Sequence, residues 1–358
     1  MKKLLYLILF ASFSAFSQIP NQQLYDEAFE KLSNMLDGKR DLSFKEAVFT
    51  VENAYLQGTL DTAFVNKKIH FLKNLSIQVQ KNGVLDYQER DKETVSKYAS
   101  LFLVLKDTTK ILDSNGEIFL HPPFSYDFED VFGHQKWENM FVSKLLGTHT
   151  GNCHSLPYLY KILAEEIGVT AHLALAPNHT YIKHRSERDG WYNTELTSGI
   201  FPIDAWLMAS GYIHLDAIRN GVYMKALDDK ESIALCLVDL ALGYQTHELY
   251  DLDFVMKCAY KALEYFPNYI SAMMLITEAK GKMIENILYS KGKDFSQARQ
   301  YPETREILEE VRQDLVKIHE LGYRQMPEEM YLDWLVSLYH ERDKYQNKKI
   351  NTFNLKTD

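Results

Sequence analysis

The sequence predicts an α+β protein with a helical N-terminal region, a central region in which helices precede short strands, and an all-helical C-terminal region. Apolar residues recur at helical spacing from about residue 21 to 106 and again after 228, whereas alternation at a spacing of two is confined to residues 169–196. A chain of 358 residues, 46% of them hydrophobic, is long enough for two or three such regions with buried cores.

The first 17 residues have the order of a secretory signal. Two lysines come first, an apolar run from Leu4 to Phe16 follows, and small residues precede Gln18. The run is shorter than the roughly 20 residues of a spanning helix, and no second run occurs later. We therefore expect an exported protein, periplasmic or secreted, that begins at Gln18 and has no integral membrane segment. The first cysteine is Cys153, which argues against a lipid anchor after the signal.

The net charge argues against a nucleic-acid partner. It is -9 for the whole chain and becomes -11 when Lys2 and Lys3 leave with the signal. Binding to phosphates needs clustered positive charge, so this balance disfavours nucleic acid.

Three cysteines are too few for a disulfide framework. Cys236 and Cys258 fall in two successive predicted helices and are either a buried pair or a bridge. Cys153 stands alone, in a different sequence setting.

The N-terminal region, residues 18–124, reads as successive amphipathic helices. The clearest one starts at Phe44, after Ser43 with Glu46 three residues on, which is a capping box, and ends at Gly58. A Ser-Asn-Gly turn and a Pro-Pro pair between residues 113 and 124 break the pattern, so a new region should begin at 125.

The central region, residues 125–228, should hold two helices followed by three strands. The helices are expected at His134–Leu146 and Cys153–Ile167, and the strands at Val169–Ala176, Thr180–Lys183 and Trp191–Leu196. This order predicts a helix packed on an antiparallel sheet.

The C-terminal region, residues 229–345, shows one partial repeat. Leu242, Gly243, Ala262 and Pro267 have the spacing of a 34-residue tetratricopeptide repeat, although Val255 stands where that repeat has a small alanine. No Gly/Ser/Pro-rich linker separates 197 from 228, so we expect this region to pack on the central one. Residues 346–358 are expected to form a flexible tail.

Cys153 is the strongest candidate for chemistry. It stands at the predicted start of a helix and on the helix's apolar side, where unpaired backbone donors and the helix dipole favour the thiolate. Taken alone, such a cysteine is more often a small core residue. Around it, Gly151, Asn152 and His154 are candidates for the cleft or for an oxyanion site, because glycine allows close backbone approach.

A histidine and a carboxylate follow Cys153 in the order that a cysteine hydrolase needs. His179 starts a predicted strand and can serve as the base that activates the thiol. Glu195 lies on the next strand, where it can orient the imidazole, and Trp191 on that strand is a further cleft candidate. Asn193 is the alternative orienting residue, because cysteine hydrolases accept an amide in that role.

The segments Gly151-x-Cys153, Asn178-His179 and Trp191-x-x-x-Glu195-x-Thr197, with the apolar helix after Cys153, resemble the transglutaminase-like superfamily. The likeness covers about residues 125–270. It implies a papain/transglutaminase-like core with Cys153 as nucleophile, His179 as base and Glu195 as the orienting acid, followed by a tetratricopeptide-like tail. Glu195 departs from the aspartate that many members have.

The resulting hypothesis is a cysteine-dependent hydrolase or acyl transferase of the peptidase, amidase or transglutaminase type. It would act on amide bonds of a protein or peptide, with cell-wall peptide as one candidate, through a thioester intermediate. The alternative is a catalytically inactive binding or scaffolding protein that holds a partner protein through its helical tail. No cofactor is expected. No metal site is expected either, since the histidines and cysteines lack ligand spacing.

Overall fold

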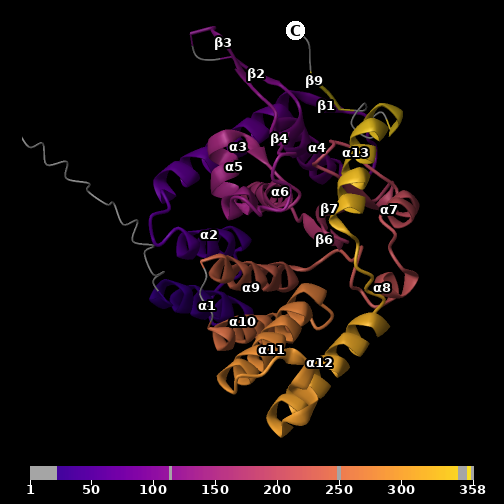
Figure 1. Cartoon of the computed structure of the whole chain (residues 1–358). Helices are drawn as coiled ribbons and strands as arrows, with labels where there is room; N and C mark the ends of the chain where they lie inside the picture. The colour runs from indigo at the N-terminus through magenta and orange to yellow at the C-terminus, as the bar shows by residue number, and fades with distance from the viewer. Residues whose placement is uncertain (1–21, 113–114, 248–250, 346–352, 356–358) are drawn as a thin grey trace, which may run out of the picture.

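The computed structural model describes residues 22–112, 115–247, 251–345 and 353–355, and the predicted signal at 1–17 lies outside them. The fold is α+β: helices surround small sheets, and one apolar core runs from Tyr25 to Leu338. Figure 1 shows the three regions of the chain packed against one another rather than strung on linkers. Within the described residues, no helix has both the length and the apolarity to cross a bilayer.

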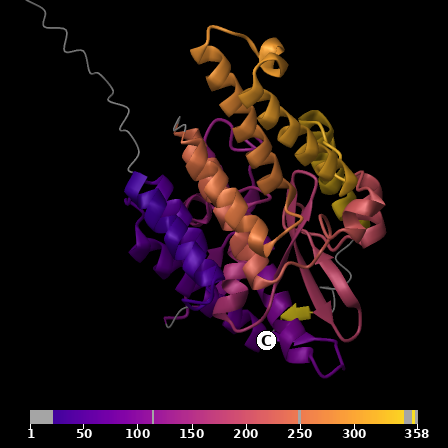
Figure 2. The same ribbon diagram turned by 90° about the horizontal axis from the view of Figure 1, so that it is seen from below.

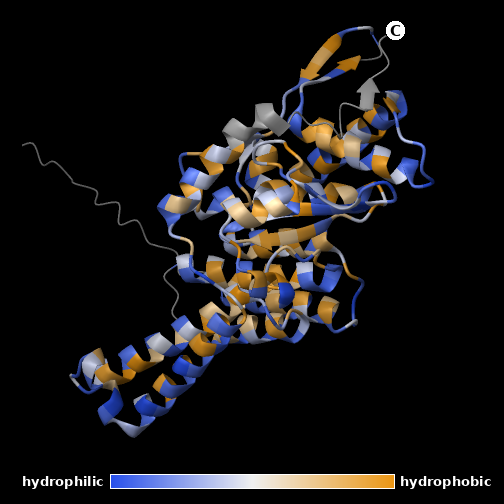
Figure 3. Ribbon diagram, turned by 90° about the vertical axis from the view of Figure 1, so that its right-hand side faces the viewer, coloured by the Kyte–Doolittle hydropathy of each residue, from blue (hydrophilic) through white to orange (hydrophobic). Residues whose placement is uncertain are grey.

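The N-terminal region is helical, as predicted. Its elements are α1 (Gln22–Leu36), α2 (Phe44–Tyr55), α3 (Thr62–Asn82), β1 (Gly83–Leu85) and α4 (Lys92–Lys106). The helix expected after Ser43 is α2, and the Ser43 side chain accepts a hydrogen bond from the Glu46 amide at 3.2 Å. A hairpin of β2 (Thr109–Leu112) and β3 (Ile118–His121) follows and projects from the body in Figure 3.

The central region starts with β4 (Ser125–Tyr126), which pairs in parallel with β5 (Thr150–Gly151). The single helix expected at His134–Leu146 is wrong. A 3-10 turn, η1 (Trp137–Met140), and α5 (Val142–Thr148) stand there instead.

The break between η1 and α5 has a visible cause. Phe141 is extended, with φ -88° and ψ 137°. The carboxylate of Glu52 on α2 accepts from the amides of Val142 and Ser143 at 2.6 and 3.0 Å. A buried carboxylate from another region therefore caps a new helix at Val142, a contact that periodicity cannot show.

The helix after the nucleophile candidate, α6 (Ser155–Glu166), begins two residues later than expected and is almost fully buried. It packs against a three-stranded antiparallel sheet in the order β6 (His172–Ala176), β7 (His179–Ser186), β8 (Gly190–Thr194). The three strands occur where the sequence predicted them, with shifted ends. Two short helices, α7 (Asp204–Ser210) and α8 (Leu215–Arg219), lead away from the sheet.

The C-terminal region is all-helical. Its elements are α9 (Asp229–Thr246), α10 (Leu252–Tyr265), α11 (Ile270–Ser290), the 3-10 turn η2 (Phe295–Gln300), α12 (Pro302–Glu320) and α13 (Glu328–Tyr345). Helices α9 to α12 pack in succession, and α9 also packs on α1 and α2, which Figure 2 shows from below. Helices α11 and α12 project from the body in Figure 3, and α13 returns to lie beside β7 in Figure 1.

The junction between the central and C-terminal regions is buried. Lys161 of α6, which is 1% exposed, reaches Asp229 of α9 at 2.8 Å. Tyr158 of α6 donates to Asp239 of α9 at 2.9 Å. Of the expected tail at 346–358, the structure describes residues 353–355, which form β9 (Phe353–Leu355) and pair antiparallel with β1.

Candidate functional site

Three separate elements bring Cys153, His179 and Glu195 together. Cys153 lies in the turn just before α6, so the helix's N-terminal amides and positive dipole end lie behind the thiol. His179 is the first residue of β7, after a tight connection in which Asn178 adopts φ 56°. Glu195 directly follows β8 and pairs with Ile200 through both backbone hydrogen bonds.

Glu195 holds the imidazole of His179 in place. Its Oε2 lies 2.5 Å from His179 Nε2, and its Oε1 accepts from the Thr197 amide at 2.6 Å. Both side chains are buried, with His179 4% and Glu195 1% exposed. Because Nε2 faces the carboxylate, Nδ1 is turned toward the thiol side of the site.

Asn193, the alternative orienting residue, is excluded by its position. Its amide nitrogen donates to the Pro202 carbonyl at 2.9 Å and to Asp204 Oδ1 at 2.7 Å. In the sheet register it stands opposite Lys183, far along the strand from His179. The two-residue spacing put both residues on one strand face, but only Glu195 reaches the end of β7 that carries the imidazole.

A tyrosine from the C-terminal helix α13 lies between the thiol and the imidazole. The Tyr331 hydroxyl donates to Cys153 Sγ at 3.1 Å and lies 2.9 Å from His179 Nδ1. Trp334, one turn further on, packs edge-on against the His179 ring at 4.9 Å. Sequence reasoning missed both residues, because an aromatic pair on a helical stripe more than 150 residues away reads as ordinary core packing.

The charges of the site favour an ion pair. Burial raises the pKa of the Cys153 thiol, but the adjacent His179 imidazole and the hydroxyls of Tyr331 and Tyr126 outweigh it and leave the pKa below its usual value. Burial lowers the pKa of His179, whereas Glu195 and the thiol raise it, to a net value of about 10. A chain of hydrogen bonds from imidazolium through the Tyr331 hydroxyl to thiolate satisfies each donor and acceptor.

The turn that carries Cys153 is fixed by its neighbours. Asn152 is fully buried; its Oδ1 accepts from the amides of His154 and Ser155 at 3.0 and 3.1 Å, and its Nδ2 donates to the Val131 carbonyl at 3.2 Å. A Cβ added to Gly151 would lie 2.4 Å from Ser155 Oγ. Asn152 is therefore a structural anchor, and the glycine is needed for packing of this turn.

His154 and Trp191, the two other cleft candidates, do not line the site. His154 Nδ1 bonds the Met140 carbonyl at 2.9 Å, and its Nε2 lies at an ion-pair distance of 3.1 Å from Asp239. Burial lowers the pKa of His154, but Asp239 outweighs it and raises the pKa. Trp191 is 47% exposed and packs edge-on against His172.

The other two cysteines differ from Cys153. All three are free and buried, so the bridge left open for Cys236 and Cys258 is absent. Burial raises the pKa of both thiols above the ordinary value, and no imidazole offsets it. Among the described residues, no group of three His, Cys, Asp or Glu side chains is arranged to hold a metal ion.

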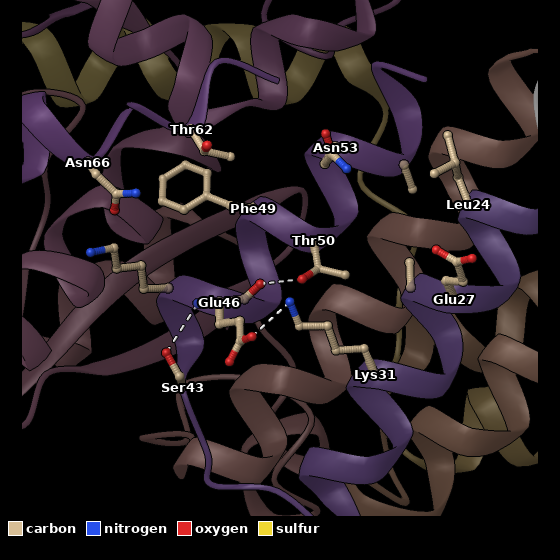
Figure 4. Close-up of a pocket in the computed structure, with 13 residues that line it drawn as sticks. Leu24, Glu27, Lys31, Ser43, Glu46, Phe49, Thr50, Asn53, Thr62 and Asn66 are labelled. Carbon is tan, nitrogen blue, oxygen red and sulfur yellow. Dashed lines mark hydrogen bonds and ion pairs between the residues drawn. The ribbon is translucent and has the colours of Figure 1, made fainter. Parts of the chain in front are cut away.

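A hollow of about 420 Å³ with both polar and apolar lining residues lies away from the site, among α1, α2 and α3. Figure 4 shows that the polar groups of its floor are engaged with one another: the Ser43 side chain accepts from the Glu46 amide, Thr50 donates to the Glu46 carbonyl at 2.6 Å, and Lys31 pairs with the Glu46 carboxylate at 2.8 Å. We assign no function to it.

Comparison of the chain with protein-family models, with curated proteins and with solved structures found no match in any of the three. The candidate site therefore stands on its own geometry.

Proposed function

We propose that the protein is a cysteine-dependent hydrolase or acyl transferase that cleaves amide bonds through a thioester on Cys153. The observation that carries the proposal is the buried array in which Glu195 orients His179, and His179 faces the thiol at the start of α6. A buried carboxylate, an imidazole with a raised pKa and a thiol with a lowered pKa are the groups that nucleophilic catalysis needs.

The reaction follows from the placement of these groups. The Cys153 thiolate attacks the carbonyl carbon, and the His179 imidazolium gives its Nδ1 proton to the leaving nitrogen as the C–N bond breaks. Neutral His179 then removes a proton from water or from an amine that attacks the thioester. Water gives hydrolysis and an amine gives transamidation. Glu195 keeps Nε2 protonated throughout.

The site described here is closed. Cys153 is 8% exposed, and Tyr331 fills the place beside Nδ1 that a leaving nitrogen would need. Trp334 covers the imidazole from the same helix and donates to Ser210 Oγ at 2.9 Å. A peptide can reach the thiol only if α13 moves, so substrate binding and helix displacement belong to one step of the proposal.

The proposal includes membership of the transglutaminase-like superfamily, with a papain/transglutaminase-like core and a tetratricopeptide-like tail. The order α6 then β6, β7 and β8, with Cys, His and Glu on successive elements, supports the core. Helices α9 to α11 packed in succession support the tail. The sequence of residues 1–17 supports export to a periplasmic or secreted location and a protein or peptide substrate found there.

One observation favours the second candidate, an inactive scaffold. The thiol is already hydrogen-bonded by Tyr331 and lies in the core, as a residue without turnover would. Under that reading the helical C-terminal region holds a partner, and Cys153 only fills space.

Intact-mass spectrometry after incubation with a small activated acyl compound, such as a nitrophenyl ester, decides between the two. The enzyme gains one acyl group, mapped to Cys153, and loses it to water or faster to an added amine. Cys153→Ser provides the matched control. Two outcomes would favour the scaffold hypothesis. Acylation could be equal in the wild type and in this variant, or it could be absent from both while Cys153 is still alkylated by iodoacetamide.

A further inference from the structure

A second tyrosine hydroxyl interacts with the thiol without forming a hydrogen bond of good geometry. The Tyr126 hydroxyl is buried, close enough to Cys153 to influence its ionisation, yet it makes no hydrogen bond of good geometry within the described part of the chain. A buried hydroxyl without a hydrogen bond of good geometry is destabilising, so such a group calls for an explanation. The backbone N–H of Cys153 likewise donates to no other described residue.

Tyr126 is held there by the backbone of the nucleophile turn itself. Strand β4 pairs in parallel with β5, with Tyr126 opposite Gly151. The Ser125 amide donates to the His149 carbonyl at 2.9 Å, and the Asp127 amide donates to the Gly151 carbonyl at 2.7 Å. Both hydrogen bonds flank Tyr126, so its position is fixed relative to Cys153 independently of α13.

We propose that Tyr126 is a catalytic residue whose hydroxyl, with the Cys153 N–H, binds the oxyanion formed during acylation; this rests on the function proposed above. When the thiolate forms the C–S bond, the carbonyl π electrons move to oxygen and create a negative charge beside these two unpaired donors. When the C–N bond breaks, the pair returns to re-form the carbonyl, and His179 supplies the proton to the leaving nitrogen. Donors already fixed at that position stabilise the negative charge most strongly in a buried site.

The two tyrosines therefore have different roles. Tyr331 engages both Sγ and Nδ1, so it must leave with α13 before a substrate can bind. Tyr126 belongs to the core and stays when α13 moves. Its hydroxyl makes no hydrogen bond of good geometry in the closed state, so it can donate to a charge that appears only in the reaction.

The test compares two reactions of the same thiol in Tyr126→Phe. Acylation by a nitrophenyl ester passes through an oxyanion, whereas alkylation by iodoacetamide displaces iodide and forms none. Both rates are measured across the pH range in which the thiolate is fully formed, so that a change in ionisation is separated from a change in oxyanion binding. We expect acylation to fall by about 100-fold, the size found for loss of one oxyanion donor, and alkylation to be unchanged.

Tyr181→Phe is the matched control. Tyr181 is also fully buried, its hydroxyl also lacks a partner among the described groups, and its ring stacks with that of His179 at 6.4 Å. Both rates should stay at the wild-type level in this variant.

Three other outcomes would contradict an oxyanion-binding role for Tyr126. An unchanged acylation rate in Tyr126→Phe removes the oxyanion role. An equal fall of acylation and alkylation assigns Tyr126 to thiol ionisation or to folding. A wild-type protein that is alkylated but never acylated refutes the proposed function itself, and the role of Tyr126 with it.

Discussion

Replacing His179 with alanine should change the ionisation of Cys153 more than any other substitution. Burial alone raises the pKa of this thiol, and the imidazole makes the largest opposing contribution. Without it the thiol should titrate at or above the ordinary value of about 8.5, at which roughly 3% is ionised at pH 7. The thiolate fraction of the variant at pH 7 should therefore be roughly 3% or less, below that of the wild type.

The pH range of the ion pair follows from the pKa shifts of Cys153 and His179. The pKa of Cys153 is lowered and that of His179 is raised to about 10, so the ion pair exists from the pH at which the thiol ionises up to about pH 10. Thiolate should appear below the usual thiol range as the pH rises, and the imidazolium should be lost near pH 10. Glu195 makes the largest contribution that raises the pKa of His179, so Glu195→Gln should move mainly the alkaline limit, to lower pH.

The ultraviolet absorbance of the thiolate, taken as the difference from Cys153→Ser, follows this titration without requiring reagent access to the closed site. The rate of alkylation read by peptide mass spectrometry gives an independent profile, and Cys236 and Cys258 serve as internal references because burial raises the pKa of both. A His179→Ala profile identical to the wild type, with Cys153 titrating as an ordinary thiol, would refute the ion pair and favour the scaffold.

Three further predictions follow from other contacts. Tyr331→Ala should speed iodoacetamide alkylation of Cys153, because it removes both the hydrogen bond and the cover, while Ser337→Ala on the same helix should not; equal rates would show that α13 does not limit access. Gly151→Ala should lower the free energy of unfolding, measured by denaturant titration, by about 1–3 kcal/mol, because its Cβ would lie 2.8 Å from Leu145 Cδ1. The control is Gly147→Ala in the same part of the chain, whose Cβ would meet nothing within 4 Å, and it should be neutral or slightly stabilising. Limited proteolysis should not release residues 229–358 as a stable fragment, because buried Lys161 and Tyr158 tie α6 to α9; a freely tumbling fragment would contradict the continuous core.

The parts of the fold that sequence could predict are those with local causes. Ser43 and Glu46 predict the start of α2, and the alternation of apolar residues around His179 predicts β7. The chain order of Cys153, His179 and Glu195 identified three residues that the structure brings to one place. The helix break at Phe141 could not be predicted in this way, because its cause is the carboxylate of Glu52, which lies 90 residues before Val142.

The two tyrosines at the thiol were beyond sequence reasoning for different reasons. Tyr331 reaches Cys153 across 178 residues, through a helix whose pattern is that of ordinary packing. Tyr126 lies on a strand of two residues whose pairing partner, Thr150–Gly151, is equally short, and so short a pair leaves no periodic signal. His154 shows the opposite error, since adjacency to Cys153 suggested a cleft residue while its side chain turns away toward Asp239.

The cover that α13 places over Cys153 also bears on how long the thiol survives. A thiolate is the form that peroxides convert to sulfenic acid, and further oxidation to the sulfinic and sulfonic acids is permanent damage. The lowered pKa that would suit Cys153 to the proposed attack on a carbonyl would also make it vulnerable in an oxidising compartment, which is where a secretory signal at residues 1–17 would send it. With Tyr331 bonded to the sulfur and Trp334 over the imidazole, we expect the closed arrangement to limit the access of oxidants to the thiolate. Under the proposed export and function, the working lifetime of the protein should therefore depend on how rarely α13 opens without a substrate.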